Sequence, residues 1–208
     1  MDWQRWHEGY TDPTSELSSR LRAVQELMRA WLDRAAPGPQ RLISMCAGHG
    51  QDVVGGLRGH CRAADVSGRL VEQDAESVRI ANAALTEAGL TAVRAVRGDA
   101  ADIAFYAGAT PADLVLVCGV FGNISEADIE NTIRVLPALC ADGGTILWTR
   151  HRQAPDVTPT IRRWFERAGF AELAFVSPGK GRYAVGAHQL TERGPAYQPP
   201  GPLFTFTR

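Results

Sequence analysis

The sequence lacks the features that mark several classes of protein. Its four cysteines form no CxxC pair and no Cys/His spacing typical of a metal site. No apolar run approaches the length of about 20 residues that a membrane-spanning helix needs. The first residues are too polar for a signal peptide. These absences argue against a secreted disulfide scaffold, a zinc protein and a membrane protein. We expect a cytoplasmic protein with reduced, structural cysteines and no metal.

Charge of one sign is also lacking, because 22 Lys and Arg stand against 23 Asp and Glu, for a net charge of −1. This balance gives no electrostatic argument for binding to nucleic acid or to an anionic membrane. Hydrophobic residues make up 45% of the 208 residues, as in ordinary globular proteins. We therefore expect one domain over residues 1–208, with no nucleic-acid partner and no membrane partner.

Residues 1–36 predict an arm followed by a helix. Asp12 is suited to cap this helix, and Pro13 to lie in its first turn. Apolar residues then recur at helical spacing, and the helix is expected to end in the run Ala35-Ala36-Pro37-Gly38-Pro39. Such an apolar stripe predicts that the helix docks onto a sheet. The residues of the stripe are Leu17, Leu21, Val24, Leu27, Met28, Trp31 and Leu32.

Residues 41–190 alternate between strand and helix patterns. Strands are predicted at 42–46, 67–72, 91–97, 113–118, 145–149, 170–176 and 182–190, and helices at 51–57, 74–89, 125–139 and 159–168. The short loop between the last two strands favours an antiparallel hairpin. The tail at 191–208 is rich in proline and glycine and is expected to be irregular, with an edge strand or a buried plug at 203–206. The order predicts an α/β fold with a mostly parallel sheet.

The first strand runs into Ala47-Gly48-His49-Gly50, where two glycines permit positive φ and a close approach of a ligand to the backbone. Strand, glycine turn and helix in this order open many nucleotide-binding α/β units. Glu72 lies 22 residues after Gly50, at the end of the second strand. That spacing suits an acid that accepts hydrogen bonds from both hydroxyls of a ribose, although an ordinary surface glutamate also fits.

Two further strand ends carry marked residues. Asp99 and Ala100 follow the third strand, and Cys118-Gly119 ends the fourth. An aspartate here suits the amino group of an adenine, and Ala100 offers its backbone N–H, although a turn-forming aspartate after glycine also fits. Because parallel strands bring their carboxyl ends to one edge of the sheet, all these residues are expected to converge on one ligand.

The segments MCAGHGQD, LVEQD, RGDA and ADLVLVCGVFGNI, in this order, resemble motifs I to IV of class I S-adenosylmethionine-dependent methyltransferases. The late antiparallel hairpin also matches that family, and the resemblance covers roughly residues 41–190. It implies a Rossmann-like, seven-stranded, mostly parallel sheet with helices on both faces and an N-terminal helical lid. It also implies S-adenosylmethionine as the cofactor and methyl transfer as the activity.

Carried over by position, the resemblance implies a cofactor site at the four strand ends. The implied contacts are Cys46, Ala47, Gly48 and Gly50 to the methionine part, Glu72 and Gln73 to the ribose, Asp99 and Ala100 to adenine, and Cys118, Gly119 and Val120 beneath the sulfonium. The family's first motif usually begins with an acid where this chain has Ser44 or Met45. The contact to the cofactor's amino group therefore stays open.

The segment after the fourth strand lacks the Asn/Asp-Pro-Pro-aromatic signature of amino-methylating DNA enzymes. With the near-neutral charge, this favours a small molecule methylated on oxygen or nitrogen. We expect the acceptor to lie among Trp3, Trp6, Phe121 and Asn123, although core packing explains the tryptophans equally well. A base is needed only if the acceptor must lose a proton. The preferred candidate is His151, and the second is Tyr10 in the arm.

Three other functions stay open. The first is an enzyme of the same fold that uses S-adenosylmethionine for another reaction, such as cyclisation. The second is a non-catalytic module that binds the cofactor. The third is a nicotinamide-dependent dehydrogenase, against which Val53 occupies the place of the usual third glycine. The sequence does not predict the oligomeric state.

Overall fold

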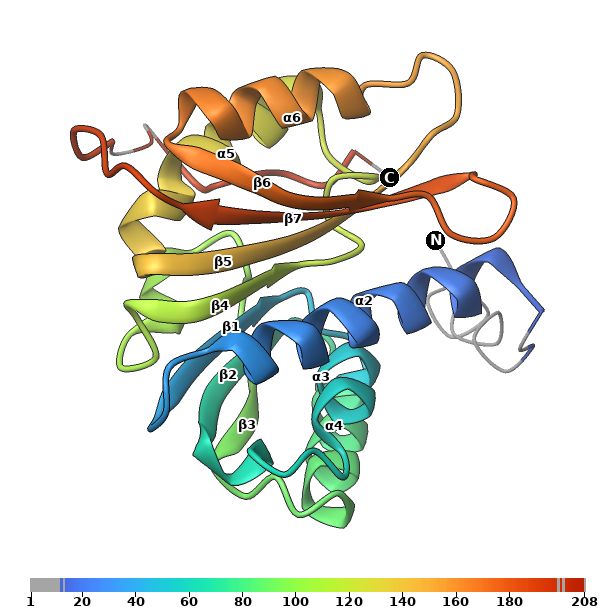
Figure 1. Ribbon diagram of the computed structural model, residues 1–208, viewed down its shortest axis with the longest axis vertical. Coiled ribbons are helices and arrows are strands. Elements are labelled where there is room, and N and C mark those ends of the chain that lie inside the picture. Colours follow the sequence, from blue (N-terminus) through green and yellow to red (C-terminus); the bar gives the residue numbers. More distant parts are fainter. Residues whose placement is uncertain (1–11, 13, 198, 200, 208) are drawn as a thin grey trace.

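The computed structural model describes residues 12, 14–197, 199 and 201–207. Seven strands form one sheet in the order β3-β2-β1-β4-β5-β7-β6 (Figure 1). The strands are β1 (Gln40–Met45), β2 (Val66–Glu72), β3 (Val93–Arg97), β4 (Ala112–Val117), β5 (Cys140–His151), β6 (Phe170–Val176) and β7 (Tyr183–Leu190). Strands β1 to β5 are parallel, and β7 is antiparallel to both β5 and β6. The predicted sheet with its late antiparallel hairpin is confirmed.

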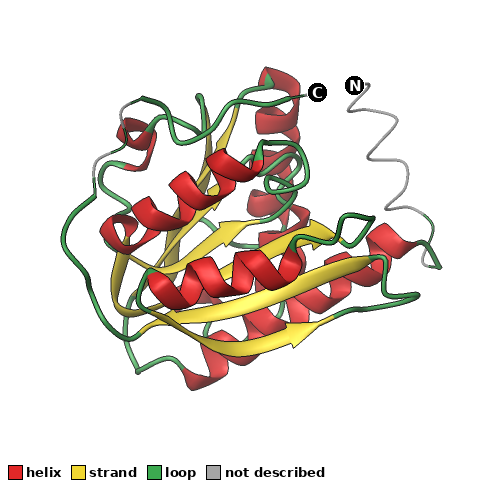
Figure 2. Ribbon diagram, turned by 90° about the horizontal axis from the view of Figure 1, so that it is seen from above, coloured by secondary structure: helices red, strands yellow, loops and turns green. Residues whose placement is uncertain are grey.

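Helices cover both faces of the sheet, as Figures 1 and 2 show. One face carries α2, α3 and α4, and the other carries α5 and α6. The helices are α2 (Glu16–Arg34), α3 (Gln51–Leu57), α4 (Ala75–Glu87), α5 (Glu126–Leu139) and α6 (Thr158–Arg167), with short 3-10 helices η1 (Ala63–Asp65) and η2 (Ile103–Tyr106). Among the described helices, none is both long enough and apolar enough to cross a bilayer.

The central strands are apolar throughout because both of their faces are covered. Successive strand residues point to opposite sides. Leu42 and Leu114 accordingly join the core beneath α2, α3 and α4, while Ile43 and Val115 join the core beneath α5 and α6. All four side chains are fully buried. The continuous hydrophobic runs of the sequence are thus explained by a sheet with two cores.

Helix α2 begins later than its sequence predicts. Ser15 is the capping residue, and its hydroxyl accepts a hydrogen bond from the Ser18 N–H at 3.0 Å. Asp12 instead accepts from the N–H of Thr14 at 2.8 Å. The prediction that Asp12 caps this helix is wrong, because Ser15 supplies a capping oxygen closer to the apolar stripe. Pro13 lies outside the described residues.

Two glycines let α2 pack closely on α3. A Cβ at Gly56 would lie 2.4 Å from the Met28 sulfur, and one at Gly55 would lie 2.1 Å from the Gln25 side chain. The glycines weaken α3 as a helix but remove the atoms that would keep α2 away. The described part of the N-terminal segment is therefore a helix docked on the sheet. The arm expected to form the lid, with Trp3, Trp6 and Tyr10, lies outside the described residues.

Strand β5 is longer than predicted because the glycine pair in it marks a bulge. The register with β4 shifts between the pair Ala112 and Cys140 and the pair Leu114 and Thr145. Gly143, in this stretch, has φ of 74°. The sequence Asp142-Gly143-Gly144 was expected as a turn before the strand, yet glycine in a strand also marks a bulge.

The C-terminal tail forms a buried plug within 203–206, one of the two structures that the sequence predicts there. Leu203 is fully buried and Phe204 is 4% exposed. The Leu203 N–H donates to the Ala101 carbonyl at 2.9 Å, and the Leu203 carbonyl accepts from the Asn131 side chain at 2.9 Å. A single bridge between Ile124 and Phe206 is the strand-like contact of this segment.

Candidate functional site

The strand order reverses between β1 and β4. The chain runs outward from β1 through β2 to β3 and then returns to β4 on the other side of β1. Open α/β sheets bind ligands outside the carboxyl ends of their strands at such a reversal. The loops that follow β1, β2, β3 and β4 therefore form the candidate site.

The loop after β1 depends on left-handed backbone conformations. Cys46, Gly48 and Gly50 have φ of 52°, 52° and 70°. At Gly50 a Cβ would also lie 3.2 Å from the Leu70 side chain and 3.4 Å from the Ala81 Cβ. A side chain at this position would be strained by its φ and crowded by its neighbours. The glycine turn expected from the sequence is thus present, and it opens α3.

Glu72 ties the glycine loop to the end of β2. Its Oε2 accepts from the Gly48 N–H at 2.8 Å, and its Oε1 accepts from the Asp74 N–H at 3.0 Å. Each carboxylate oxygen keeps a second acceptor site, so these bonds leave capacity for two ribose hydroxyls. Sequence reasoning missed the bond to Gly48. Gln73, beside it, is exposed, and its carbonyl accepts from Arg97 Nε at 3.2 Å.

The loop after β3 is fixed by bonds within its own turn. Asp99 Oδ1 accepts from the Ala101 N–H at 2.9 Å. The Ala100 carbonyl accepts from the buried Tyr106 hydroxyl at 2.8 Å, and burial raises the pKa of that hydroxyl well above its usual value. At Gly98 a Cβ would come within 2.3 Å of the Phe105 ring. Tyr106 and Phe105, in η2, are supports that sequence reasoning missed.

A buried acid lies behind the glycine loop. Burial raises the pKa of Asp52, in the first turn of α3, while nearby Arg20 and the Cys118 thiol lower it. Arg20 comes from α2 and is 6% exposed. Sequence reasoning did not assign a role to Asp52, although it belongs to the MCAGHGQD segment.

The four cysteines all lie among the described residues, and none is in a disulfide. Burial raises the pKa of the thiols of Cys46 and Cys118. A thiol is a poor nucleophile unless its pKa is lowered. The raised pKa of both thiols therefore argues against a nucleophilic role.

The loop after β4 turns at Gly119, whose φ is 80°. The Gly119 N–H donates to the Thr149 hydroxyl at 2.9 Å, and its carbonyl accepts from the Asn123 side chain at 2.7 Å. Val120 is fully buried. Any contact that it makes with a ligand is therefore through its backbone.

The prediction that the Phe121 ring encloses the acceptor is wrong. The ring is fully buried, with centroids 6.1 Å from Trp148 and 6.4 Å from Phe165. It packs in the core beneath α6. The sequence alone did not indicate that this side chain is buried.

A cavity of about 160 Å³ lies beside Gly119, at the carboxyl ends of β4 and β5. It brings together three predicted site residues, Gly119, Asn123 and His151. Its described lining residues are Arg20, Gly119, Gly122, Asn123, Thr149, Arg150, His151, Gln153 and Tyr183. The other candidates for the acceptor side, Trp3, Trp6 and Tyr10, lie outside the described residues.

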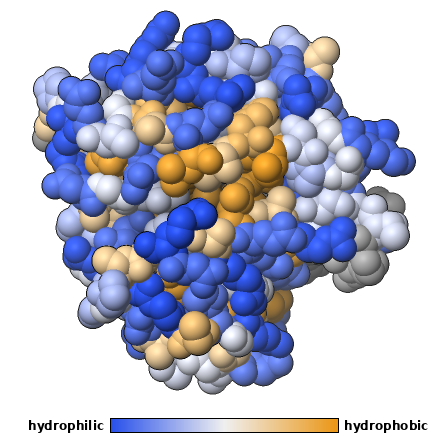
Figure 3. Space-filling model, in the orientation of Figure 1, coloured by the Kyte–Doolittle hydropathy of each residue, from blue (hydrophilic) through white to orange (hydrophobic). Residues whose placement is uncertain are grey.

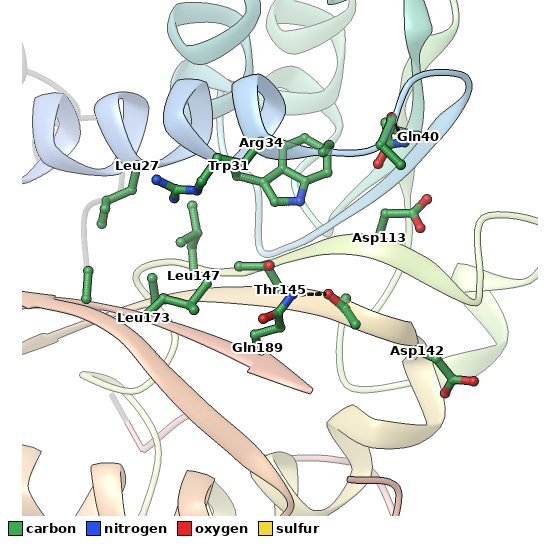
Figure 4. A pocket seen from close by; sticks show the side chains of 16 residues that line it. Leu27, Trp31, Arg34, Gln40, Asp113, Asp142, Thr145, Leu147, Leu173 and Gln189 are labelled. Atoms are coloured by element: carbon green, nitrogen blue, oxygen red, sulfur yellow. Dashed lines mark hydrogen bonds between the residues drawn. The ribbon is translucent and has the colours of Figure 1, made fainter. Parts of the chain in front are cut away.

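A larger cavity, of about 400 Å³, lies at the opposite edge of the sheet (Figure 4). It is bounded by Leu27 and Trp31 of α2 and by Thr145, Leu173 and Gln189 of the strands. Figure 3 shows apolar surface over the strands on this side of the molecule, where Leu173 is 48% exposed. Because this cavity is remote from the carboxyl ends of the parallel strands, we do not place the chemistry there.

No protein-family model and no curated protein matches this chain. Solved structures do. An O-methyltransferase family protein from Burkholderia thailandensis has a TM-score of 0.65 and 20% identity, over 82% of this chain and 55% of that one. This chain thus spans about half the length of that protein.

Two further solved structures have the same fold and other activities. An RNA methyltransferase from Salinibacter ruber, in complex with S-adenosyl-L-homocysteine, has a TM-score of 0.55 and 18% identity, over 82% of this chain and 94% of that one. The [4+2]-cyclase SpnF has a TM-score of 0.58 and 17% identity, over 79% of this chain and 80% of that one. The sheet order and these likenesses together show that the chain has the fold of class I S-adenosylmethionine-dependent methyltransferases.

Proposed function

We propose that this protein binds S-adenosylmethionine and transfers its methyl group to an oxygen or nitrogen of a small molecule. The observation that carries the proposal is the convergence of four loops at one edge of the sheet, with Glu72 tied to Gly48. A cramped glycine turn, a carboxylate with spare acceptor sites and an Asp-Ala turn fit the methionine, ribose and adenine parts of this cofactor.

Each loop has its own part in the proposed cofactor site. The proposed contacts are Cys46, Ala47, Gly48 and Gly50 for the methionine part, Glu72 and Gln73 for the ribose, Asp99 and Ala100 for adenine, and the backbone of Cys118, Gly119 and Val120 near the sulfonium. Bound S-adenosylmethionine supplies an electrophilic methyl group. The residues of this chain supply position, and fixing two reactants in line can lower a barrier by about 7–11 kcal/mol.

His151 is the proposed base because it lines the same cavity as Gly119 and Asn123. It would take the proton of a hydroxyl or ammonium acceptor. Tyr10 remains the second candidate, and Trp3 and Trp6 remain proposed walls of the acceptor site. The net charge of −1 supports a small molecule over an RNA acceptor.

Calorimetric titration tests the cofactor. We expect S-adenosylhomocysteine and S-adenosylmethionine to bind with one site per chain. Binding of a nicotinamide dinucleotide alone, or of no nucleotide, would overturn the proposal. Incubation with radiolabelled S-adenosylmethionine and a panel of phenols, amines and carboxylic acids then tests transfer, and a cofactor that binds but never yields product indicates the non-catalytic alternative.

Cyclisation is a second candidate function, because the cyclase SpnF resembles this chain about as closely as the methyltransferases do. The product separates the two functions. Methyl transfer adds one methyl group to the acceptor and forms S-adenosylhomocysteine, whereas cyclisation leaves the mass of the substrate unchanged and consumes no cofactor. Mass spectrometry of both components after one incubation makes the distinction.

A further inference from the structure

The charged side chains among the described residues of the cavity beside Gly119 are all basic. They are Arg20 and Arg150, with His151 next to them. The other described lining side chains are neutral and polar, from Asn123, Thr149, Gln153 and Tyr183. A ligand that enters this cavity therefore meets positive potential and many hydrogen-bonding groups.

The basic side chains come from two separate parts of the chain and line the same cavity. Arg20 belongs to α2, and its guanidinium lies 5.4 Å from the centroid of the Tyr183 ring. Tyr183 in turn pairs with His151 across β7 and β5. Two elements that are far apart in the sequence thus place Arg20 and His151 beside one tyrosine.

Arg150 and His151 approach the cavity from the end of β5. A Cβ built on Gly122 would lie 3.5 Å from His151 Cδ2 and 3.9 Å from Arg150 Nη1. Nη1 donates to the Phe121 carbonyl, which holds the guanidinium in place. A guanidinium carries five donors in a rigid fork, and this shape matches the oxygens of a carboxylate or phosphate.

Charged groups near Arg20 and Arg150 show which arginines belong to this cavity. Asp52 lies close enough to Arg20 for its pKa to be lowered by that charge, so Arg20 also serves the buried acid. Arg152, two residues beyond Arg150, is directed elsewhere, because it pairs with Asp156 at 2.9 Å and with the Ser177 hydroxyl at 3.0 Å. Arg152 is therefore not part of the cavity, whereas Arg150 and Arg20 both line it.

We propose that the methyl acceptor carries an anionic group, a carboxylate or a phosphate, which binds in this cavity between Arg150 and Arg20, with His151 at its edge. The inference rests on the proposed function, because the cavity adjoins Gly119, near which the reacting sulfur is proposed to lie. Hydrogen bonds between a guanidinium and an oxyanion are about twice as strong as neutral ones, so charge would select the acceptor.

Two probes of nearly the same shape, one anionic and one neutral, test this proposal. We would titrate the protein with 4-hydroxybenzoate and 4-hydroxybenzamide, with and without S-adenosylhomocysteine. The acid is expected to bind about tenfold or more tightly than the amide. Phenyl phosphate in the same titration distinguishes a phosphate site from a carboxylate site. Equal binding of acid and amide, or binding of neither, overturns the proposal.

Variants of two arginines test which side chain causes the preference for the acid. Arg150→Gln should abolish the preference for the acid, Arg150→Lys should keep part of it, and Arg152→Gln should keep all of it as the matched control. Should Arg150→Gln fail to fold, the comparison of Arg150→Lys with Arg152→Gln still reads the effect. An unchanged preference in both Arg150 variants overturns the proposal.

Competition separates the acceptor from the cofactor. If 4-hydroxybenzoate displaces S-adenosylhomocysteine, the cations bind the carboxylate of the cofactor, and the inference is wrong while methyl transfer stands. If S-adenosylhomocysteine does not bind at all, the proposed function fails, and the titrations without it still measure the charge preference of the cavity.

Discussion

Trp148 Nε1 donates a hydrogen bond to His188 Nδ1 at 3.1 Å, inside the core between the sheet and α6. His188 is 1% exposed, and its ring is stacked on Phe165 with centroids 4.4 Å apart. Its Nε2 lies 3.6 Å from Glu172 Oε2. Burial lowers the pKa of His188 from 6.5 to about 4, and the Trp148 bond requires an unprotonated Nδ1.

This pair predicts an acid-sensitive fold. The folded protein holds His188 neutral while the unfolded chain binds a proton below pH 6.5. The stabilisation is therefore complete above about pH 6.5 and is lost as pH falls towards about 4. Urea unfolding at several pH values measures it. His188→Phe replaces the imidazole with an apolar ring that does not titrate. The free energy of unfolding of this variant should therefore vary less over this pH range. An equal slope in both proteins would contradict the prediction.

A matched pair of glycines tests the cofactor loop. Gly50 and Gly59 have φ of 70° and 71°, so alanine is strained at both, by about 1–2 kcal/mol. At Gly50 the new Cβ would also meet Leu70 at 3.2 Å, whereas at Gly59 nothing lies within 4 Å. Gly50→Ala should lower both the melting temperature and the affinity for S-adenosylhomocysteine, and Gly59→Ala the melting temperature only. Equal affinities in the two variants would remove Gly50 from the site.

Glu72 is predicted to be the acid that most affects cofactor affinity. In Glu72→Gln one acceptor oxygen becomes an NH₂ donor, and it then faces Gly48 N–H, Asp74 N–H or a ribose hydroxyl. Hydrogen bonds to charged groups contribute about 1.5–3 kcal/mol, so S-adenosylhomocysteine should bind about tenfold or more weakly. Glu87, with its side chain 75% exposed and paired only loosely with Arg58 at 3.4 Å, provides the control variant Glu87→Gln. A Glu72 variant of wild-type affinity would contradict this assignment.

Local patterns were sufficient to predict the loops that follow β1 to β4, which form the candidate site. Each strand end carries its own signal, such as the glycines after β1 or Asp99 after β3, and parallel strands place those ends at one edge. The alternation predicted an α/β fold with a mostly parallel sheet, and the resemblance to the methyltransferase family implied its seven strands. The buried runs at 42–46 and 113–118 have no alternation of polar residues because helices cover both faces.

Side-chain direction and long-range packing were not predictable in the same way. The sequence suggested Phe121 as a residue of the acceptor site, but its ring is fully buried in the core. Arg20 lines the cavity from α2, which lies close to α3 at Gly55 and Gly56. Such contacts depend on the relative placement of whole elements, which no local pattern encodes.

The C-terminal tail is predicted to support two loops of the site. Leu203 bonds to the Ala101 carbonyl after β3, and the Thr207 N–H donates to the Asn123 carbonyl at 2.9 Å. Leu203→Ala removes a fully buried side chain and should lower the free energy of unfolding by about 2–5 kcal/mol. Leu173→Ala, at a leucine that is 48% exposed, should change it far less. Urea titration compares the two, and similar losses would show that Leu203 does not anchor the tail.

His151 is predicted to affect turnover without affecting cofactor binding. General-base catalysis contributes about 10²–10⁴-fold, so His151→Gln should lower kcat at least about a hundredfold for an acceptor whose hydroxyl ionises above the assay pH. Its affinity for S-adenosylhomocysteine should match wild type, because His151 is proposed to contact the acceptor and not the cofactor. His60→Gln is the control, since His60 bonds to Asp33 at 3.0 Å and does not line the cavity. A His151 variant with wild-type kcat on such an acceptor would transfer the role to another group or to water, and Tyr10→Phe would then be the next variant to assay.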